Sequence, residues 1–226
     1  MNPDKITLIR EAIAQARAEE AQTHQLATFL AATAPGLHGA IALPEENPEK
    51  VLLEFIVRYI EHVPDFLQTL DDLMHSCGLR EHGRVFITIA EDFFLQPREL
   101  VRQCGGLRGL IDEAYFAHRL MEEVNDRLIL LCGVPLTPVD TTLANIVVHD
   151  LLGETYANQL DLAVHYAMEV LFEPGKSLEK SNLTQFVARY QACDWAAKLR
   201  GWPTQGNDSG IRLRLAETLS PKARAH

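Results

Sequence analysis

The apolar residues between Leu52 and Cys77 recur every three or four positions, which is the period of an α-helix. Asn47-Pro48 precedes them as a start signal, because asparagine caps a helix and proline suits its first turn. The stripe keeps its phase across Pro64, so we predict one kinked helix, or two nearly collinear helices, over residues 48–77. Its members are Leu52, Phe55, Ile56, Tyr59, Ile60, Val63, Phe66, Leu67, Leu70, Leu73, Met74 and Cys77.

Similar signals along the chain predict an all-α, single-domain multi-helix bundle of about seven to eight helices. Helices are expected over residues 3–33, 48–77, 84–95, 97–104, 107–132, 138–172, 183–200 and 210–219. Residues 84–95 begin with β-branched side chains, but no second strand lies nearby to pair with them, so a helix is favoured. The domain is expected to span residues 1–220, with residues 221–226 as a disordered tail.

The two longest predicted helices, near 107–132 and 138–172, are joined by a short connection, which favours an antiparallel pair. Thr137-Pro138-Val139-Asp140 starts the second helix with three agreeing signals: a threonine cap, a proline after it and an acid three residues on. A straight helix over 138–172 would be about 50 Å long. Because that exceeds what an ordinary domain needs, we predict a bend near Gly153.

The chain is acidic, and its charge and composition exclude several classes of protein. The formal net charge is −10 at pH 7 with no block of lysine or arginine, which makes nucleic acid and anionic membranes poor partners. No apolar run reaches the roughly 18 residues that span a bilayer, and the N-terminus lacks the apolar core of a signal peptide. The scattered cysteines, Cys77, Cys104, Cys132 and Cys193, form no metal-finger pattern. We therefore expect a cytoplasmic protein.

From Leu128 to Gly175 the chain contains six carboxylates and two histidines but no lysine or arginine. These residues are Asp140, Asp150, Glu154, Asp161, Glu169, Glu173, His149 and His165. Most of them share one polar stripe of the predicted helix over 138–172. Acids on a helix usually have cations one turn away, so the balancing charge must come from elsewhere. Three interpretations stay open: the stripe faces water, it docks against arginines elsewhere in the fold or in a second subunit, or it lines a metal or catalytic pocket.

The third interpretation takes a specific form on the helix over 107–132, where His118 lies on the apolar inner face and Glu122 at its edge. In an antiparallel pair they come level with residues 148–152, close to His149 and Glu154. Imidazole nitrogen and carboxylate oxygen suit a transition metal, so these four residues form a candidate site for a divalent ion. Their spacing matches no complete signature, and the Glu-x-x-His pairs of di-iron bundles are absent.

Two functional hypotheses follow from these patterns. The first, slightly favoured because no complete catalytic signature is present, is a non-enzymatic helical protein that associates with itself, as a homodimer, or with another protein. Its acidic surface would then select the partner by charge. The second is a metal-dependent enzyme, with carboxylate and histidine ligands of di-iron type, whose site lies between the helices over 107–132 and 138–172. Neither identifies a substrate, because helical bundles host many functions.

Overall fold

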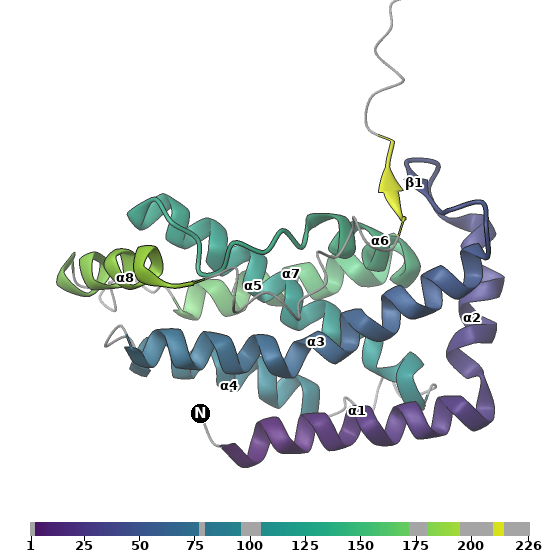
Figure 1. The fold of residues 1–226 in the computed structure, drawn as a ribbon, viewed down its shortest axis with the longest axis horizontal. Coiled ribbons are helices and arrows are strands. Elements are labelled where there is room, and N and C mark those ends of the chain that lie inside the picture. Colours follow the sequence, from purple (N-terminus) through teal and green to yellow (C-terminus); the bar gives the residue numbers. More distant parts are fainter. Residues whose placement is uncertain (1–2, 77–79, 96–104, 172–179, 195–209, 215–226) are drawn as a thin grey trace, which may run out of the picture.

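The computed structural model describes residues 3–76, 80–95, 105–171, 180–194 and 210–214, which are almost entirely helical (Figure 1). This described part holds eight α-helices, two 3₁₀ helices and two short strands. In chain order they are α1 (Pro3–Thr23), α2 (Gln25–Thr33), η1 (Ala34–Gly36), β1 (Ile41–Ala42), α3 (Pro48–Ser76), α4 (Arg80–Leu95), η2 (Gly106–Leu110), α5 (Ile111–Cys132), α6 (Thr142–Leu152), α7 (Glu154–Leu171), α8 (Lys180–Ala192) and β2 (Arg212–Leu213). The predicted all-α, multi-helix fold is confirmed.

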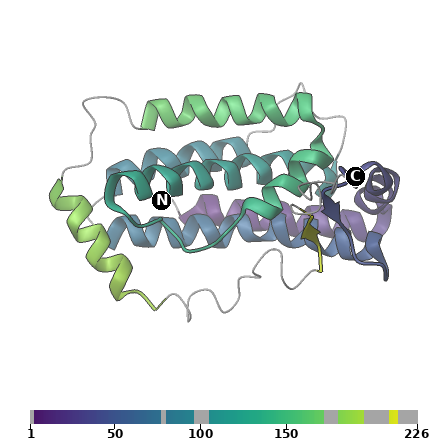
Figure 2. The same ribbon diagram turned by 90° about the horizontal axis from the view of Figure 1, so that it is seen from above.

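The helices are stacked in layers, with α1 on one side, α3 and α4 beside it, and α5 and α7 beyond them (Figure 1 and Figure 2). α5 packs against α3, α4, α6, α7 and α8, so it forms the centre of the molecule. At one end lies α8, and β1, β2 and α6 lie toward the other (Figure 1 and Figure 2). The ionisable residues of α5 therefore meet those of α6 and α7 near the strand end of the molecule.

α3 is one continuous helix with Pro64 inside it, as the apolar stripe predicts. A proline inside a helix costs about 3 kcal/mol, because it removes one backbone N–H and crowds the preceding turn. Burial of a large apolar side chain contributes roughly 1.5–3 kcal/mol each, so the buried stripe outweighs that cost. The buried members are Leu52, Phe55, Ile56, Tyr59, Ile60, Val63, Phe66, Leu67, Leu70 and Met74.

The helix predicted to run to about Thr33 is divided into α1 and α2 at His24, whose φ of 51° is left-handed. Glu20 explains the division. Its carboxylate accepts hydrogen bonds from the N–H groups of Leu26 at 2.8 Å and Ala27 at 3.0 Å. These groups open α2 and have no carbonyl partner within that helix, so a side chain of α1 caps α2. The inner face of α1 packs into the core, with Ile6, Ile9, Ile13 and Ala16 buried.

The helix predicted to begin at Pro138 begins instead at Thr142, after a connection that runs back along α5 (Figure 2). Asn125 of α5 holds this connection, because its side-chain oxygen accepts the N–H groups of Leu136 at 2.9 Å and Thr137 at 3.2 Å. Leu136 and Thr137 are both buried. Burial and these tertiary hydrogen bonds override the local start signal, because local helix propensity contributes little free energy compared with tertiary contacts.

The predicted second long helix is two helices, α6 and α7, which reverse direction at Gly153 (Figure 2). Gly153 has φ 83° and ψ 139°, a conformation that only glycine adopts without strain. α6 runs antiparallel to α5, as predicted. α7 runs parallel to α5. The Tyr156 hydroxyl donates a hydrogen bond to Asp112 near the start of both helices, and further along both helices Arg119 donates one to Asp161. The prediction of one bent helix antiparallel to α5 is therefore wrong for its second half.

Replacing Gly153 with alanine is expected to lower the free energy of unfolding by about 1.5 kcal/mol, because an L-residue is strained in this conformation. None of the described residues lies within 4 Å of the position that the added Cβ would take, so the cost would come from the backbone. Chemical denaturation of the purified chain measures it. Gly36→Ala is the matched control, since its Cβ also meets no described residue within 4 Å and its φ is not left-handed. Equal losses for the two variants would contradict this explanation.

The remaining helix predictions have mixed outcomes. Residues 84–95 are helical, within α4, and residues 107–132 form the end of η2 followed by α5. Residues 212–213, predicted to be helical, form β2 instead, which pairs antiparallel with β1. Sequence patterns missed this pair because its partners lie far apart in the chain. The predicted helix over 97–104 and the predicted tail over 221–226 lie outside the described residues.

Candidate functional site

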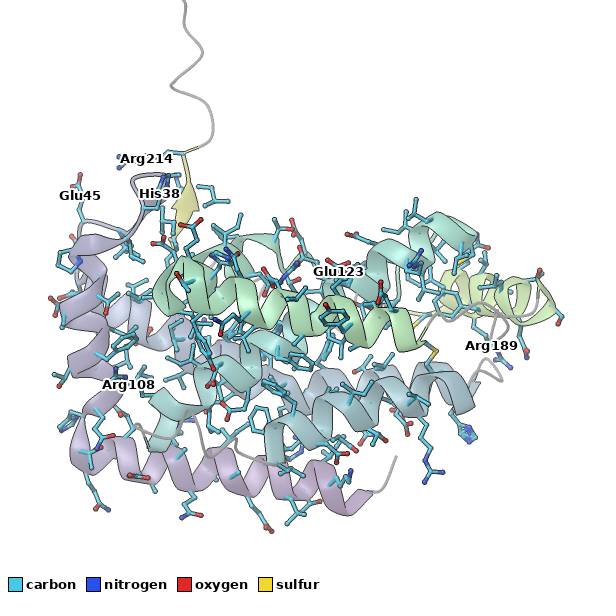
Figure 3. All side chains as sticks on the ribbon, turned by 180° about the vertical axis from the view of Figure 1, so that it is seen from behind. His38, Glu45, Arg108, Glu123, Arg189 and Arg214 are labelled. Carbon is cyan, nitrogen blue, oxygen red and sulfur yellow. The ribbon has the colours of Figure 1, made fainter. Side chains whose placement is uncertain are left out.

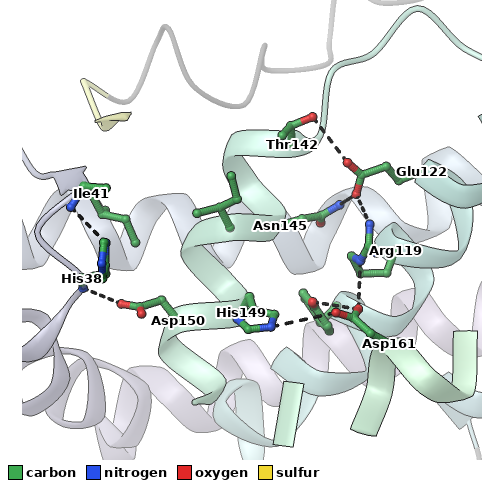
Figure 4. A pocket seen from close by; sticks show the side chains of 12 residues that line it. His38, Ile41, Arg119, Glu122, Thr142, Asn145, His149, Asp150 and Asp161 are labelled. Atoms are coloured by element: carbon green, nitrogen blue, oxygen red, sulfur yellow. Dashed lines mark hydrogen bonds and ion pairs between the residues drawn. The ribbon is translucent and has the colours of Figure 1, made fainter. Parts of the chain in front are cut away.

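A pocket of about 370 Å³ opens between the segment leading into β1 and the helices α5, α6 and α7 (Figure 4). The reversal of direction at Gly153 creates this pocket, because the reversal places α6 and α7 together against α5. Charged and polar side chains from these helices converge on the pocket (Figure 4). The lining residues are His38, Ala40, Ile41, Tyr115, Arg119, Glu122, Thr142, Asn145, Ile146, His149, Asp150 and Asp161.

Arg119 is the central charge of the pocket, and three carboxylates surround its guanidinium group. Its Nε donates to Asp161 Oδ1 at 2.9 Å, and its Nη1 donates to Glu122 Oε2 at 2.5 Å. Its Nη2 donates to Glu123 Oε1 at 3.2 Å. Burial alone would lower the pKa of Arg119, but the hydrogen bonds to Asp161 and Glu122 raise it above its ordinary value. An incoming anion would therefore meet a guanidinium that protein carboxylates already neutralise.

Asn145 connects the pocket to the core. Its side chain is only 4% exposed, and it donates to Glu122 Oε2 at 2.6 Å. Its oxygen accepts the hydroxyl hydrogen of Tyr59, a buried residue of α3, at 2.7 Å. A buried polar group without a partner costs about 1–3 kcal/mol, so these bonds fix the Asn145 amide, and through it one wall of the pocket, to α3.

His118, the first of the predicted metal ligands, lies in the core and does not line the pocket. It is 3% exposed, and its ring stacks on Tyr59 with centroids 4.0 Å apart. Nε2 lies 2.9 Å from the Tyr59 carbonyl oxygen, an acceptor, so the proton sits on Nε2. Nδ1 has no hydrogen-bond partner among the described residues. Burial lowers the pKa of His118 from 6.5 to about 4, which keeps the ring neutral at pH 7.

The other three predicted ligands are divided. Glu122 and His149 line the pocket, whereas Glu154 is exposed at the start of α7. His149 Nε2 lies 3.2 Å from Asn158 Oδ1 and 3.9 Å from Asp161 Oδ2. In the part of the chain that the structure describes, no group of three His, Cys, Asp or Glu side chains is placed to hold a metal ion. The structure brings Glu122 and His149 to one pocket and does not bring the four residues together.

The acids of the cation-free stretch are balanced in different ways. Asp161 is paired with Arg119, so for this residue the stripe docks against an arginine within the fold. Asp150 and Asp140 each accept a backbone N–H group, from His38 and Thr142. The acids described on the outer surface of α7, Glu154 and Glu169, are exposed to solvent.

The chain matches no protein-family model, no curated protein and no solved structure. Among the described helices, none combines the length and the apolar character that crossing a membrane requires.

Several residues that build the pocket were not selected from the sequence. Arg119 had a usable signal, because Glu122 and Glu123 follow it at the spacing of helical ion pairs. Asn145 and Tyr115 had none, since their roles depend on the register between helices. His38 and Ile41 come from the long connection before α3, whose path no local pattern predicts.

Proposed function

We propose that the protein acts by binding another protein through the exposed face of α7. Leu162 and Tyr166 lie one helical turn apart on that face and are 52% and 58% exposed. Large apolar side chains that are left in water together are typical of an interaction site, and tyrosine is enriched at protein interfaces. This pair of side chains is the observation that carries the proposal. The opposite face of α7 is occupied by the fold, with Ala157, Leu160, Val164 and Met168 buried.

Charge narrows the class of partner. Glu154 and Glu169 are exposed on α7, Glu123 stands beside it, and residues 128–171 contain no lysine or arginine (Figure 3). Two copies of this face would bring like charges together, so a basic surface on another protein fits it better than a second copy does. The arginines labelled in Figure 3 stand away from α7: Arg108, Arg189 and Arg214.

This association would take place in the cytoplasm. The cysteines are scattered along the sequence. In the described part of the chain Cys132 and Cys193 are free thiols. Unpaired cysteines are usual where the environment is reducing.

A Leu162→Asp/Tyr166→Asp double variant tests the proposal by affinity capture with cross-linking from an extract of the native cells. Recovery of the partner is expected to fall about tenfold or more, because loss of two interface anchors costs at least about 1.4 kcal/mol. Leu8→Asp is the matched control, since Leu8 is 49% exposed on α1, and it should leave recovery unchanged.

Sedimentation velocity of the purified chain at several concentrations separates self-association from binding to another protein. A dimer that the double variant abolishes would make the partner a second copy, in line with the homodimer expected from the sequence. The proposal is contradicted if the wild-type chain stays monomeric and the double variant captures the same proteins as the wild type.

A further inference from the structure

Three acids line the pocket, and each ties one carboxylate oxygen to the protein. Glu122 Oε2 accepts hydrogen bonds from Arg119 and Asn145. Asp161 Oδ1 accepts from Arg119 and from the hydroxyl group of Tyr115 at 3.0 Å. Asp150 Oδ2 accepts the backbone N–H of His38 at 2.8 Å. The acids are therefore held in place by the fold instead of moving freely in solvent.

The second oxygen of each acid is poorly satisfied. Among the described residues, Asp150 Oδ1 accepts no hydrogen bond. Asp161 Oδ2 has His149 Nε2 at 3.9 Å, which is beyond hydrogen-bond distance. In the described part of the chain, Glu122 Oε1 accepts a hydrogen bond only from the Thr142 hydroxyl, at 3.4 Å. The pocket thus presents carboxylate oxygens, fixed through their neighbours, that can each accept a further donor.

The balance of charge excludes an anion and favours a cation. The lining includes three carboxylates but one guanidinium group, that of Arg119, which is already bonded to two of them. The described residues offer no three-ligand arrangement for a metal ion. An organic cation with several N–H donors, spread over a few ångströms, can reach more than one of these oxygens at once.

The walls between the acids suit an aliphatic chain. Ile41 and Ile146 line the pocket together with the ring of Tyr115. An arginine side chain combines an apolar stem, which packs on such walls, with a planar head whose five donors match carboxylates. The compact ammonium group of lysine can bind one carboxylate well, but it cannot reach several separate carboxylates at once.

We infer that this pocket binds the side chain of an arginine that a partner protein inserts between α5, α6 and α7. The source of the arginine rests on the proposed function, whereas the chemistry of the ligand rests on the pocket alone. Glu122, Asp150 and Asp161 accept the guanidinium donors, and Ile41 and Ile146 contact the stem. Asn145 keeps the Glu122 carboxylate in position through its bond to Tyr59.

The test is a titration of the ¹⁵N-labelled full chain with N-acetyl-arginine methylamide, followed by NMR. The expected result is saturable shifts at the amides of His38, Ile41 and Thr142. The citrulline analogue, which has the same length and no charge, should shift none of them.

Two variants test the role of the acids. Asp150→Asn keeps an oxygen that can accept the His38 N–H, and it should weaken arginine binding about fivefold, the scale of one partly exposed ion pair. Glu11→Gln removes an exposed carboxylate of α1, outside the pocket lining, and should leave binding unchanged.

Equal shifts with the citrulline analogue, or an unchanged affinity in Asp150→Asn, overturn the inference. The source of the arginine is tested separately by capture of the partner with the Asp150→Asn chain. Reduced capture supports an arginine of the partner, and unchanged capture overturns that source and leaves a free guanidinium compound as the ligand. The two proposals can fail separately. If the wild-type chain binds the arginine derivative saturably but the α7 double variant still captures the partner, the proposed function fails and the pocket inference stands.

Discussion

Replacing Arg119 with methionine is expected to lower the free energy of unfolding by about 3 kcal/mol. Removal of one partner from a buried ion pair costs about 3–5 kcal/mol, and partial exposure of this cluster places the loss at the lower end. The substitution leaves Glu122 and Asp161 close together without the cation that separates them. Urea denaturation at pH 7 measures the loss, with the slope of the transition confirming that both chains unfold in one step.

Two comparisons make the Arg119 experiment specific. Arg84→Met removes an exposed arginine of α4 and should change stability by less than about 0.5 kcal/mol. Adding Asp161→Asn to the Arg119→Met chain should cost less than the same change in the wild type, because interacting residues are not additive. Additive losses would show that Arg119 and Asp161 do not stabilise each other, contrary to their 2.9 Å hydrogen bond.

Replacing His118 with phenylalanine is expected to make stability less sensitive to acid. In the folded chain burial lowers the pKa of His118 to about 4, and in the unfolded chain the ring takes up a proton below about pH 6.5. The unfolded state therefore binds more protons between these values, so stability is complete above pH 6.5 and is lost as the pH falls toward 4. Between pH 7 and pH 5 the loss due to His118 is about 2 kcal/mol.

Denaturation of wild type and His118→Phe at pH 7 and pH 5 gives this difference directly. Burial also lowers the pKa of His62 to about 4, so the variant keeps part of the acid sensitivity. Phenylalanine preserves the stacking on Tyr59, which limits the change at pH 7. His165→Gln replaces an exposed histidine and should change the free energy of unfolding at pH 7 by less than about 0.5 kcal/mol. If the free energies of unfolding of His118→Phe and wild type differ by the same amount at pH 7 and at pH 5, a neutral, buried His118 is contradicted.

The fold was predictable where the determining signal is local. The stripe of α3 follows from its spacing, and burial carries α3 through Pro64. The helix over 84–95 follows from the lack of a nearby second strand in the sequence. The breaks were not predictable in the same way. The break at His24 depends on where the Glu20 carboxylate reaches, and a glycine such as Gly153 is compatible with either a bend or a reversal.

The site was predictable only in part, for the same reason. The sequence correctly placed His118 on the inner face of α5, and it identified Glu122 and His149 as residues that could meet. It placed Glu122 level with residues 148–152, whereas its bonded partners on α6 are Thr142 and Asn145. That offset arises because α6 begins later than the local start signal indicated. An error of one helical turn is enough to change which side chains share a pocket.

The pocket has walls from two distant parts of the chain, which are synthesised at different times. The residues around His38 and Ile41 leave the ribosome well before α5, α6 and α7, which follow one another and can pack locally with little loss of loop entropy. Docking of the early part, through the bond between His38 and Asp150, completes the pocket. A ligand that binds only the finished pocket stabilises the fully assembled chain by mass action. Newly made chains would then mature more completely in cells where the ligand is abundant.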